Sequence, residues 1–154
     1  MKILMVCLGN ICRSPIADGL LRKKVKDAGL DVQVDSAGTS AHHVGEAPDR
    51  RMRETAKRLG CPIDDLRARQ FVVADFDQFD VIYAMDASNF NNINSLSRSE
   101  EDRKKVKLLL NEVYPGENRA VPDPYYGGEQ GFIDVFNMVD EATTKIIKTI
   151  LDGR

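Results

Sequence analysis

A cysteine and an arginine that could act on a phosphate group lie close together near the start of the chain. Residues 6–15 read VCLGNICRSP and place Cys7 six positions before Arg13. A thiolate is a strong nucleophile, and a guanidinium can hold two phosphate oxygens in a bidentate fork. If a helix begins near Arg13, its N-terminus and the arginine both stabilise negative charge on Cys7. These residues therefore predict attack of sulfur on a bound phosphorus atom.

The same stretch could instead be a nucleotide-binding loop, or Cys7 could be a core residue. The segment GNICRS lacks the second glycine and the lysine of a P-loop, and no G-x-G-x-x-G dinucleotide turn is present. A cysteine at the end of a strand can also be a core residue, and its spacing from an arginine can arise by chance. The context favours a reactive thiol, because a buried strand precedes it, a glycine lies within the loop and Ser14-Pro15 follows.

Alternating strands and helices must position this loop. The apolar pattern predicts strands at residues 2–7, 30–36, 79–85 and 106–110, and helices at residues 14–28, 48–59 and 132–151. Ser14 is the expected cap of the first helix, with Pro15 in its first turn. The expected fold is α/β, with one three-layer, doubly wound, flavodoxin-like domain over residues 1–154. A four-stranded parallel sheet should carry helices on both faces.

Long loops at residues 38–47 and 117–131 are expected to reach the same edge of the sheet as the loop after Cys7, because ligands bind beyond the carboxyl ends of parallel strands. The net charge of −2 gives no reason to expect nucleic acid or an anionic membrane as a partner. No apolar run is long enough to span a membrane or to act as a secretory signal. Three cysteines, an odd number, argue against a disulfide framework and favour a cytoplasmic location.

The stretch around Cys7 resembles the signature loop of the low-molecular-weight protein tyrosine phosphatases. Further motifs follow in the same order along almost the whole chain: DSAGT at 35–39, RARQ at 67–70, Met85-Asp86 with Asn89, and DPYYG at 123–127. The resemblance implies a phosphatase that hydrolyses phosphotyrosine and aryl phosphates through a covalent phosphocysteine on Cys7, with Arg13 binding the phosphate. No metal or other cofactor is expected, since Arg13 and the loop amides can neutralise the phosphoryl charge.

The resemblance also implies a phosphate-binding loop made of Leu8, Gly9, Asn10, Ile11, Cys12, Arg13 and Ser14. Asn10 should brace this loop, and Ser14 should hydrogen-bond the Cys7 thiolate. Cys12 is the expected redox partner, because a disulfide between Cys7 and Cys12 would protect the nucleophile from overoxidation. Asp86, just after the third strand, fits either a structural role or a helix N-cap.

By the same resemblance, Asp123 is the general acid. The chemistry requires one, because the tyrosyl oxygen would otherwise leave as a phenolate, and the same group can later activate water against the phosphocysteine. An Asp-Pro pair can instead open a turn. Pro122, Pro124, Tyr125 and Tyr126 are expected to shield Asp123 and favour its protonated form. The expected pH profile is bell-shaped, with an acidic optimum.

The substrate wall departs from the family pattern. Family members commonly place an aromatic side chain in the loop after residues 36–38, but this chain reads TSAHHVGEAPD there and contains no tryptophan. We expect His42 to take the wall position, with His43 as the alternative; both histidines could instead be solvated loop residues. Tyr125 and Tyr126 should form the opposite wall and are candidate phosphorylation sites. The adjacent histidines have no partner spacing that would suggest zinc.

Two other functions remain open at this point. A thiol-dependent arsenate reductase has a similar loop but needs further cysteines late in the chain, and none follows Cys61, which we interpret as structural. A non-catalytic phosphotyrosine-binding module would be expected to lack Cys7 or Asp123, and both are present. The expected partners are a phosphotyrosine-containing protein and a tyrosine kinase, and the expected oligomeric state is a monomer.

Overall fold

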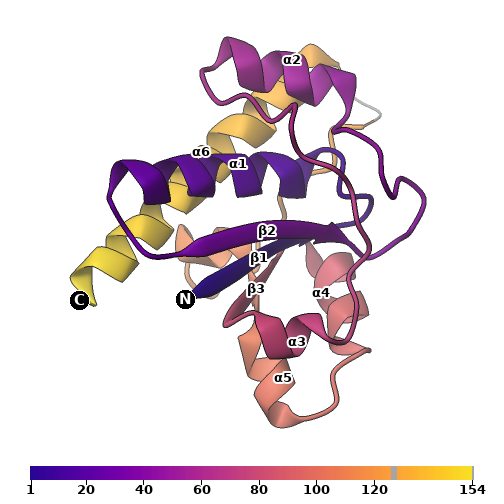
Figure 1. The fold of residues 1–154 in the computed structure, drawn as a ribbon, viewed down its shortest axis with the longest axis vertical. Helices are drawn as coiled ribbons and strands as arrows, with labels where there is room; N and C mark the ends of the chain where they lie inside the picture. Colours follow the sequence, from indigo (N-terminus) through magenta and orange to yellow (C-terminus); the bar gives the residue numbers. More distant parts are fainter. Residues whose placement is uncertain (126–127, 154) are drawn as a thin grey trace.

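Four parallel strands form the centre of the molecule. The computed structural model describes residues 1–125 and 128–153 (Figure 1). The strands are β1 (Lys2–Cys7), β2 (Gln33–Gly38), β3 (Val81–Ala84) and β4 (Val106–Leu108). Their order in the sheet is β2-β1-β3-β4, and every neighbouring pair is parallel. This is the strand order of a doubly wound, flavodoxin-like fold.

Helices cover both faces of the sheet, so the domain has three layers (Figure 1). One face carries α1 (Arg13–Asp27), α2 (Arg50–Arg58) and α6 (Glu129–Asp152). The other carries α3 (Asp75–Gln78), α4 (Ala87–Asn94) and α5 (Glu100–Lys105). A short 3-10 helix, η1 (Leu109–Glu112), follows β4. No helix in the described part of the chain is long and apolar enough to cross a membrane.

The continuous apolar run of β1 explains why both of its faces are covered. Ile3, Met5 and Cys7 belong to the core that also contains residues of α1 and α6, whereas Leu4 and Val6 belong to the core beneath α3 and α4. Successive side chains of a strand point to opposite faces, so such a run requires a partner layer on each side. β1 therefore lies in the middle of the domain and ends where Cys7 meets the surface loops.

The predicted sheet and the three long helices are confirmed, but several boundaries were wrong. β2 runs over Gln33–Gly38 rather than 30–36, because it pairs residue by residue with β1. β3 is shorter than predicted, and β4 ends at Leu108, where the chain turns into η1. Helices α3, α4 and α5 were not predicted, since each spans too few residues to show a helical period.

The prediction that Ser14 caps the first helix is also wrong. Cys12 occupies the N-cap position of α1 without a side-chain cap, and Ser14 lies inside the first turn. A capping side chain would occupy the N–H groups at the start of the helix. No side chain caps the start of α1, so the N–H groups of its first turn are left for an anion to bind.

Candidate active site

A pocket of about 200 Å³ opens at the carboxyl edge of the sheet. The loop after β1, the loop after β2 and the segment before α6 all contribute to it. Its described lining consists of Cys7, Leu8, Gly9, Ile11, Cys12, Arg13, Ser40, His42, His43, Asp123 and Tyr125. The structure thus brings together the predicted nucleophile, arginine, acid and wall residues, apart from Tyr126, which lies outside the described residues.

Cys7 presents its sulfur to hydrogen-bond donors at the base of the pocket. The residue is 3 % exposed. The backbone N–H of Asn10 donates to Sγ at 3.3 Å, and the Ser14 hydroxyl lies 3.0 Å from Sγ. Ser14 Oγ accepts a hydrogen bond from the Asn10 amide, and its own proton can be donated to the sulfur at 3.0 Å or to the Ala37 carbonyl at 3.4 Å. Such donors, together with the N-terminus of α1, stabilise negative charge on Cys7.

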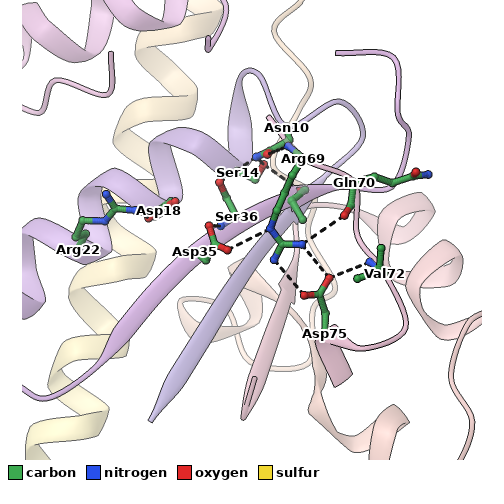
Figure 2. A network of polar contacts seen from close by, with 11 residues as sticks. Asn10, Ser14, Asp18, Arg22, Asp35, Ser36, Arg69, Gln70, Val72 and Asp75 are labelled. Carbon is green, nitrogen blue, oxygen red and sulfur yellow. Dashed lines mark hydrogen bonds and ion pairs between the residues drawn. The ribbon is translucent and has the colours of Figure 1, made fainter. Parts of the chain in front are cut away.

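Asn10 fixes the shape of the phosphate-binding loop. Its φ angle is 57°, a left-handed conformation that asparagine tolerates better than most residues. Its Nδ2 donates to Ser14 Oγ at 2.8 Å and to Ser36 Oγ at 3.0 Å, while its Oδ1 accepts from the backbone N–H of Arg69 at 3.0 Å (Figure 2). The amide therefore ties the loop to β2 and to the segment at residues 67–70, in agreement with the bracing position implied by the resemblance.

Arg69 supports this arrangement from behind. Its guanidinium binds Asp35 at 3.2 Å and both carboxylate oxygens of Asp75 at 3.1 Å (Figure 2). Burial disfavours the charged guanidinium, but Asp75 and Asp35 outweigh it and raise the pKa of Arg69. Asp75 also accepts the backbone N–H of Val72. This network, which the sequence did not reveal, holds the Arg69 backbone against Asn10.

Arg13 lies on the first turn of α1 and is also buried. Its Nη1 donates to Asp86 Oδ2 at 2.6 Å and to the Val121 carbonyl at 3.1 Å. Its Nη2 lies 3.8 Å from Asp123 Oδ2. Burial opposes the charge, but Cys7, Asp86 and Asp123 together raise the pKa of Arg13. The side chain is thus a fixed cation between the nucleophile and the acid loop.

Asp86 has both of the roles that the sequence left open. One carboxylate oxygen binds Arg13, and the other accepts the backbone N–H of Asn89 at 2.8 Å, which caps α4. The helix N-cap and the ion pair are therefore compatible, because each uses a different oxygen. Asp86 orients Arg13 from the end of β3.

Asp123 is more open than expected. Its side chain is 41 % exposed, so Pro122, Pro124 and Tyr125 shield it less than predicted, and Tyr126 lies outside the described residues. Its Oδ1 accepts the backbone N–H of Tyr125 at 3.0 Å, which is the local turn that an Asp-Pro pair favours. The turn and the acid position coexist, because the carboxylate still reaches the pocket and Arg13.

Both of the histidines between which the sequence left the wall position open line the pocket. His42 is exposed, whereas His43 is partly buried and its Nδ1 lies 3.0 Å from Glu46 Oε2. His43 also lies close to Gly9: a methyl group on that glycine would be 3.0 Å from the imidazole. Each of the two side chains contributes to the pocket lining, as does Tyr125, and the wall role of either histidine stays a prediction.

The three cysteines are free and buried. Burial and the nearby Asp49 raise the pKa of Cys12, which keeps it a neutral thiol beside Cys7. Burial likewise raises the pKa of Cys61, which belongs to the core around α1, as predicted for a structural residue. Within residues 1–125 and 128–153, no cluster of three or more His, Cys, Asp or Glu side chains is placed to hold a metal ion.

Comparisons with known proteins agree with this geometry. The chain matches the model of a family described as low molecular weight phosphotyrosine protein phosphatase over residues 2–153. The protein of that name from Schizosaccharomyces pombe is 43 % identical over 152 residues, which cover 97 % of this chain and 96 % of the yeast protein. The human protein of that name is 41 % identical over 137 residues, covering 88 % of this chain and 86 % of its own length.

A solved structure is similar as well. The crystal structure of a protein tyrosine phosphatase from Entamoeba histolytica, with Hepes in the active site, superposes with a TM-score of 0.92 at 37 % identity. The match covers 99 % of this chain and 98 % of the amoebal chain. The similarity therefore extends over the whole domain and includes every element that contributes to the pocket.

Proposed function

The chain belongs to the low molecular weight phosphotyrosine protein phosphatase family, and we propose that Cys7, Arg13 and Asp123 carry out its chemistry. The enzyme is a protein-tyrosine phosphatase that hydrolyses phosphotyrosine through a covalent phosphocysteine. The observation that supports the residue assignment best is the convergence of all three side chains on one pocket at the end of β1. A sulfur nucleophile, a buried cation and a carboxyl group are the three functions that the two-step reaction needs.

In the first step, the phosphate group of the substrate lies over the loop amides and the guanidinium of Arg13. The Cys7 thiolate attacks phosphorus while the bond to the tyrosyl oxygen breaks, and protonated Asp123 gives its proton to that oxygen. Arg13 and the N-terminus of α1 stabilise the charge on the phosphoryl oxygens while the bond from sulfur to phosphorus forms and the bond from phosphorus to the tyrosyl oxygen breaks. The products of this step are free tyrosine side chain and phosphocysteine.

In the second step, Asp123, now ionised, takes a proton from water as that water attacks the phosphocysteine. The sulfur leaves as a thiolate, and Ser14 and the Asn10 N–H stabilise its charge. Inorganic phosphate is released and Asp123 is protonated again. The exposed carboxylate of Asp123 suits this exchange of a proton with solvent.

Several further features of the enzyme belong to the same proposal. The substrate is a phosphotyrosine-containing protein, whose ring lies between His42 or His43 and Tyr125. The protein acts as a monomeric, cytoplasmic, single catalytic domain over residues 1–154, and a tyrosine kinase is a further partner. Cys12, a buried thiol that lines the pocket with Cys7, forms a reversible disulfide with it under oxidation.

Hydrolysis of phenyl phosphate in the presence of EDTA tests the mechanism. We expect the wild type to turn over with a bell-shaped pH profile and an acidic optimum, because Cys7 must be ionised while Asp123 is protonated. Cys7→Ser should be inactive, and Asp123→Ala should retain a small fraction of the wild-type activity. Activity that is lost in chelator, or that rises steadily to alkaline pH, would contradict the assignment.

A further inference from the structure

The start of α2 lies between the two loops that carry the chemistry. The backbone N–H of Asp49, the N-cap of α2, donates to the Ile11 carbonyl in the phosphate-binding loop at 2.7 Å. Two residues later, Arg51 Nη2 donates to the Tyr125 carbonyl in the acid loop at 2.7 Å. Neither Asp49 nor Arg51 is among the described residues that line the pocket of Cys7. They connect the two sides of the site from outside it.

Arg51 is held by several contacts although its side chain is exposed. Asp49 binds it through both carboxylate oxygens, with Nε at 3.2 Å and Nη2 at 3.1 Å. Its guanidinium lies 4.7 Å from the ring centre of the buried Phe132 and 5.3 Å from that of Tyr125. Planar stacking and a bidentate partner leave a guanidinium little rotational freedom. The hydrogen bonds that Arg51 donates to Asp49 raise the pKa of Arg51, so its guanidinium stays charged.

Tyr125 links Arg51 to Asp123 through its backbone. The carbonyl of Tyr125 accepts the hydrogen bond from Arg51, while the N–H of Tyr125 donates to Asp123 Oδ1 at 3.0 Å. Fixing the Tyr125 backbone at one end therefore fixes the turn that presents the carboxylate. Asp123 needs such support, because it is exposed and its ion pair with Arg13 is long, at 3.8 Å.

We infer that Arg51 is a positioning residue for the general acid. Arg51 holds the Tyr125 carbonyl against α2, and α2 is bound to the phosphate-binding loop through Asp49. In this way Arg51 keeps the Asp123 carboxyl group close enough to the bound phosphate to protonate the leaving oxygen. This inference rests on the proposed role of Asp123. A positioning role differs from a general structural role in what the loss of Arg51 does. It should slow only the reactions of substrates whose leaving group must be protonated.

Two substrates with different leaving groups test this inference. Phenyl phosphate needs protonation of a poor leaving group, whereas the leaving group of 2,4-dinitrophenyl phosphate departs as a stable anion. For Arg51→Met, kcat/KM should fall about tenfold on phenyl phosphate and change by less than about twofold on the dinitrophenyl ester, since a small misplacement of an acid is costly only where the acid is used. Arg51→Lys should recover part of the loss, because a lysine can still donate one hydrogen bond.

Arg50 provides the matched control. It precedes Arg51 on the same helix, its side chain is 82 % exposed and its partner is Glu54 at 3.0 Å. Arg50→Met removes the same charge and the same number of atoms, so it should leave both substrates unchanged. A loss of the same size in Arg50→Met would show that net charge, and not the contact with Tyr125, explains the effect, and would overturn the inference.

The Asp123→Ala background separates this inference from the proposed function. If Asp123 is the acid and Arg51 acts through it, adding Arg51→Met to Asp123→Ala should change kcat/KM on phenyl phosphate by less than about twofold. An equal loss on both substrates in Arg51→Met, or a further tenfold loss in the double variant, would overturn the inference about Arg51 and leave the role of Asp123 intact. Full activity of Asp123→Ala itself on phenyl phosphate would instead refute the proposed acid.

Discussion

The nucleophile side and the acid side of the pocket are built in opposite ways. Cys7, Asn10 and Arg13 are each at most 3 % exposed, and the side chain of each has at least two hydrogen-bond partners. Asp123 is 41 % exposed and is oriented by the N–H of Tyr125 and by a long ion pair. The two sides meet at Arg13 and, on the outside, at Arg51.

The difference follows from what each side must do. The sulfur of Cys7 has to keep one position while it forms and breaks its bond to phosphorus, and the buried guanidinium has to keep its charge through both steps. Burial with saturated hydrogen bonds provides both. A general acid must release a proton and recover it from water, so it needs access to solvent. Changes on the nucleophile side should therefore affect both activity and stability, whereas changes on the acid side should affect activity alone.

Among variants that keep the nucleophile, the largest effect is expected for Arg13→Lys on the buried side. A lysine keeps the charge but cannot bind Asp86, the Val121 carbonyl and two phosphate oxygens at once. We expect kcat/KM on phenyl phosphate to fall at least about a thousandfold, and competitive inhibition by inorganic phosphate to weaken. Steady-state kinetics measures both. A loss of less than tenfold would mean that a positive charge at this position is sufficient for catalysis without the bidentate contact of a guanidinium with phosphate.

Asp123→Asn should give a smaller loss of activity without a loss of stability. The amide cannot donate a proton to the leaving oxygen, so kcat/KM on phenyl phosphate should fall about a hundredfold. The free energy of unfolding, measured by urea titration, should change by no more than about 0.5 kcal/mol, because the side chain is exposed. Destabilisation by more than about 2 kcal/mol would remove the contrast between the two sides.

Asn10→Ala should destabilise the protein as well as slow it. The change removes three hydrogen bonds of the side chain and places alanine in a left-handed conformation, so we expect a loss of about 2–4 kcal/mol in the free energy of unfolding. Asn10→Gly is the control, because glycine accepts the backbone angle; it should recover about 1 kcal/mol but not the activity. Equal stability of both variants would show that the backbone angle costs nothing.

The smallest effect concerns Asp18, a buried carboxylate on α1 behind the phosphate-binding loop (Figure 2). Burial raises its pKa to about 6 from 3.8, although Arg22 and Ser36 oppose the shift. The folded protein thus binds this proton more tightly than the unfolded chain, and the stability that the proton confers is complete below about pH 4 and lost as the pH rises through 6.

Urea titrations of the wild type and Asp18→Asn at several pH values measure this contribution. The free energy of unfolding of the wild type, relative to the variant, should fall by about 2–3 kcal/mol between pH 4 and pH 7. A difference that stays constant over this range would mean that Asp18 titrates normally. In that case the region behind the nucleophile would be more open to water than its burial indicates.

The sequence predicted the nucleophile side well because its information is local. The apolar run of β1 fixes where the sheet places Cys7, and residues 7–14 follow it directly, so the strand, the loop and the helix could be placed from one short stretch. The four strands were found for the same reason. The bounds of β1 were also predicted correctly, but those of β2, β3 and β4 were not, because pairing with a neighbouring strand, rather than the strand's own pattern, decides where these strands stop.

The acid side was predicted less completely. Asp123 could be named from its motif, but its exposure could not, since exposure depends on how residues 121–125 lie against the end of β3. The contacts of Arg51 with Tyr125 and of Arg69 with Asp35 join segments far apart in the chain. Arg69 belongs to the RARQ motif that the resemblance marks, but neither this motif nor the sequence around Arg51 indicates which distant residues the two arginines contact.

Direct detection of the covalent intermediate tests the central claim. In Asp123→Ala, 2,4-dinitrophenyl phosphate should still phosphorylate Cys7, whereas hydrolysis of the intermediate lacks its base, so phosphocysteine should accumulate and survive rapid acid quenching. Mass spectrometry of the tryptic peptide at residues 3–13 should then reveal one added phosphoryl group. Because this peptide also contains Cys12, the measurement should be repeated in Cys12→Ser, which should retain the group, and in Cys7→Ser, which should not. A phosphoryl group on any other residue, or continued turnover with Cys7 unmodified, would contradict the account.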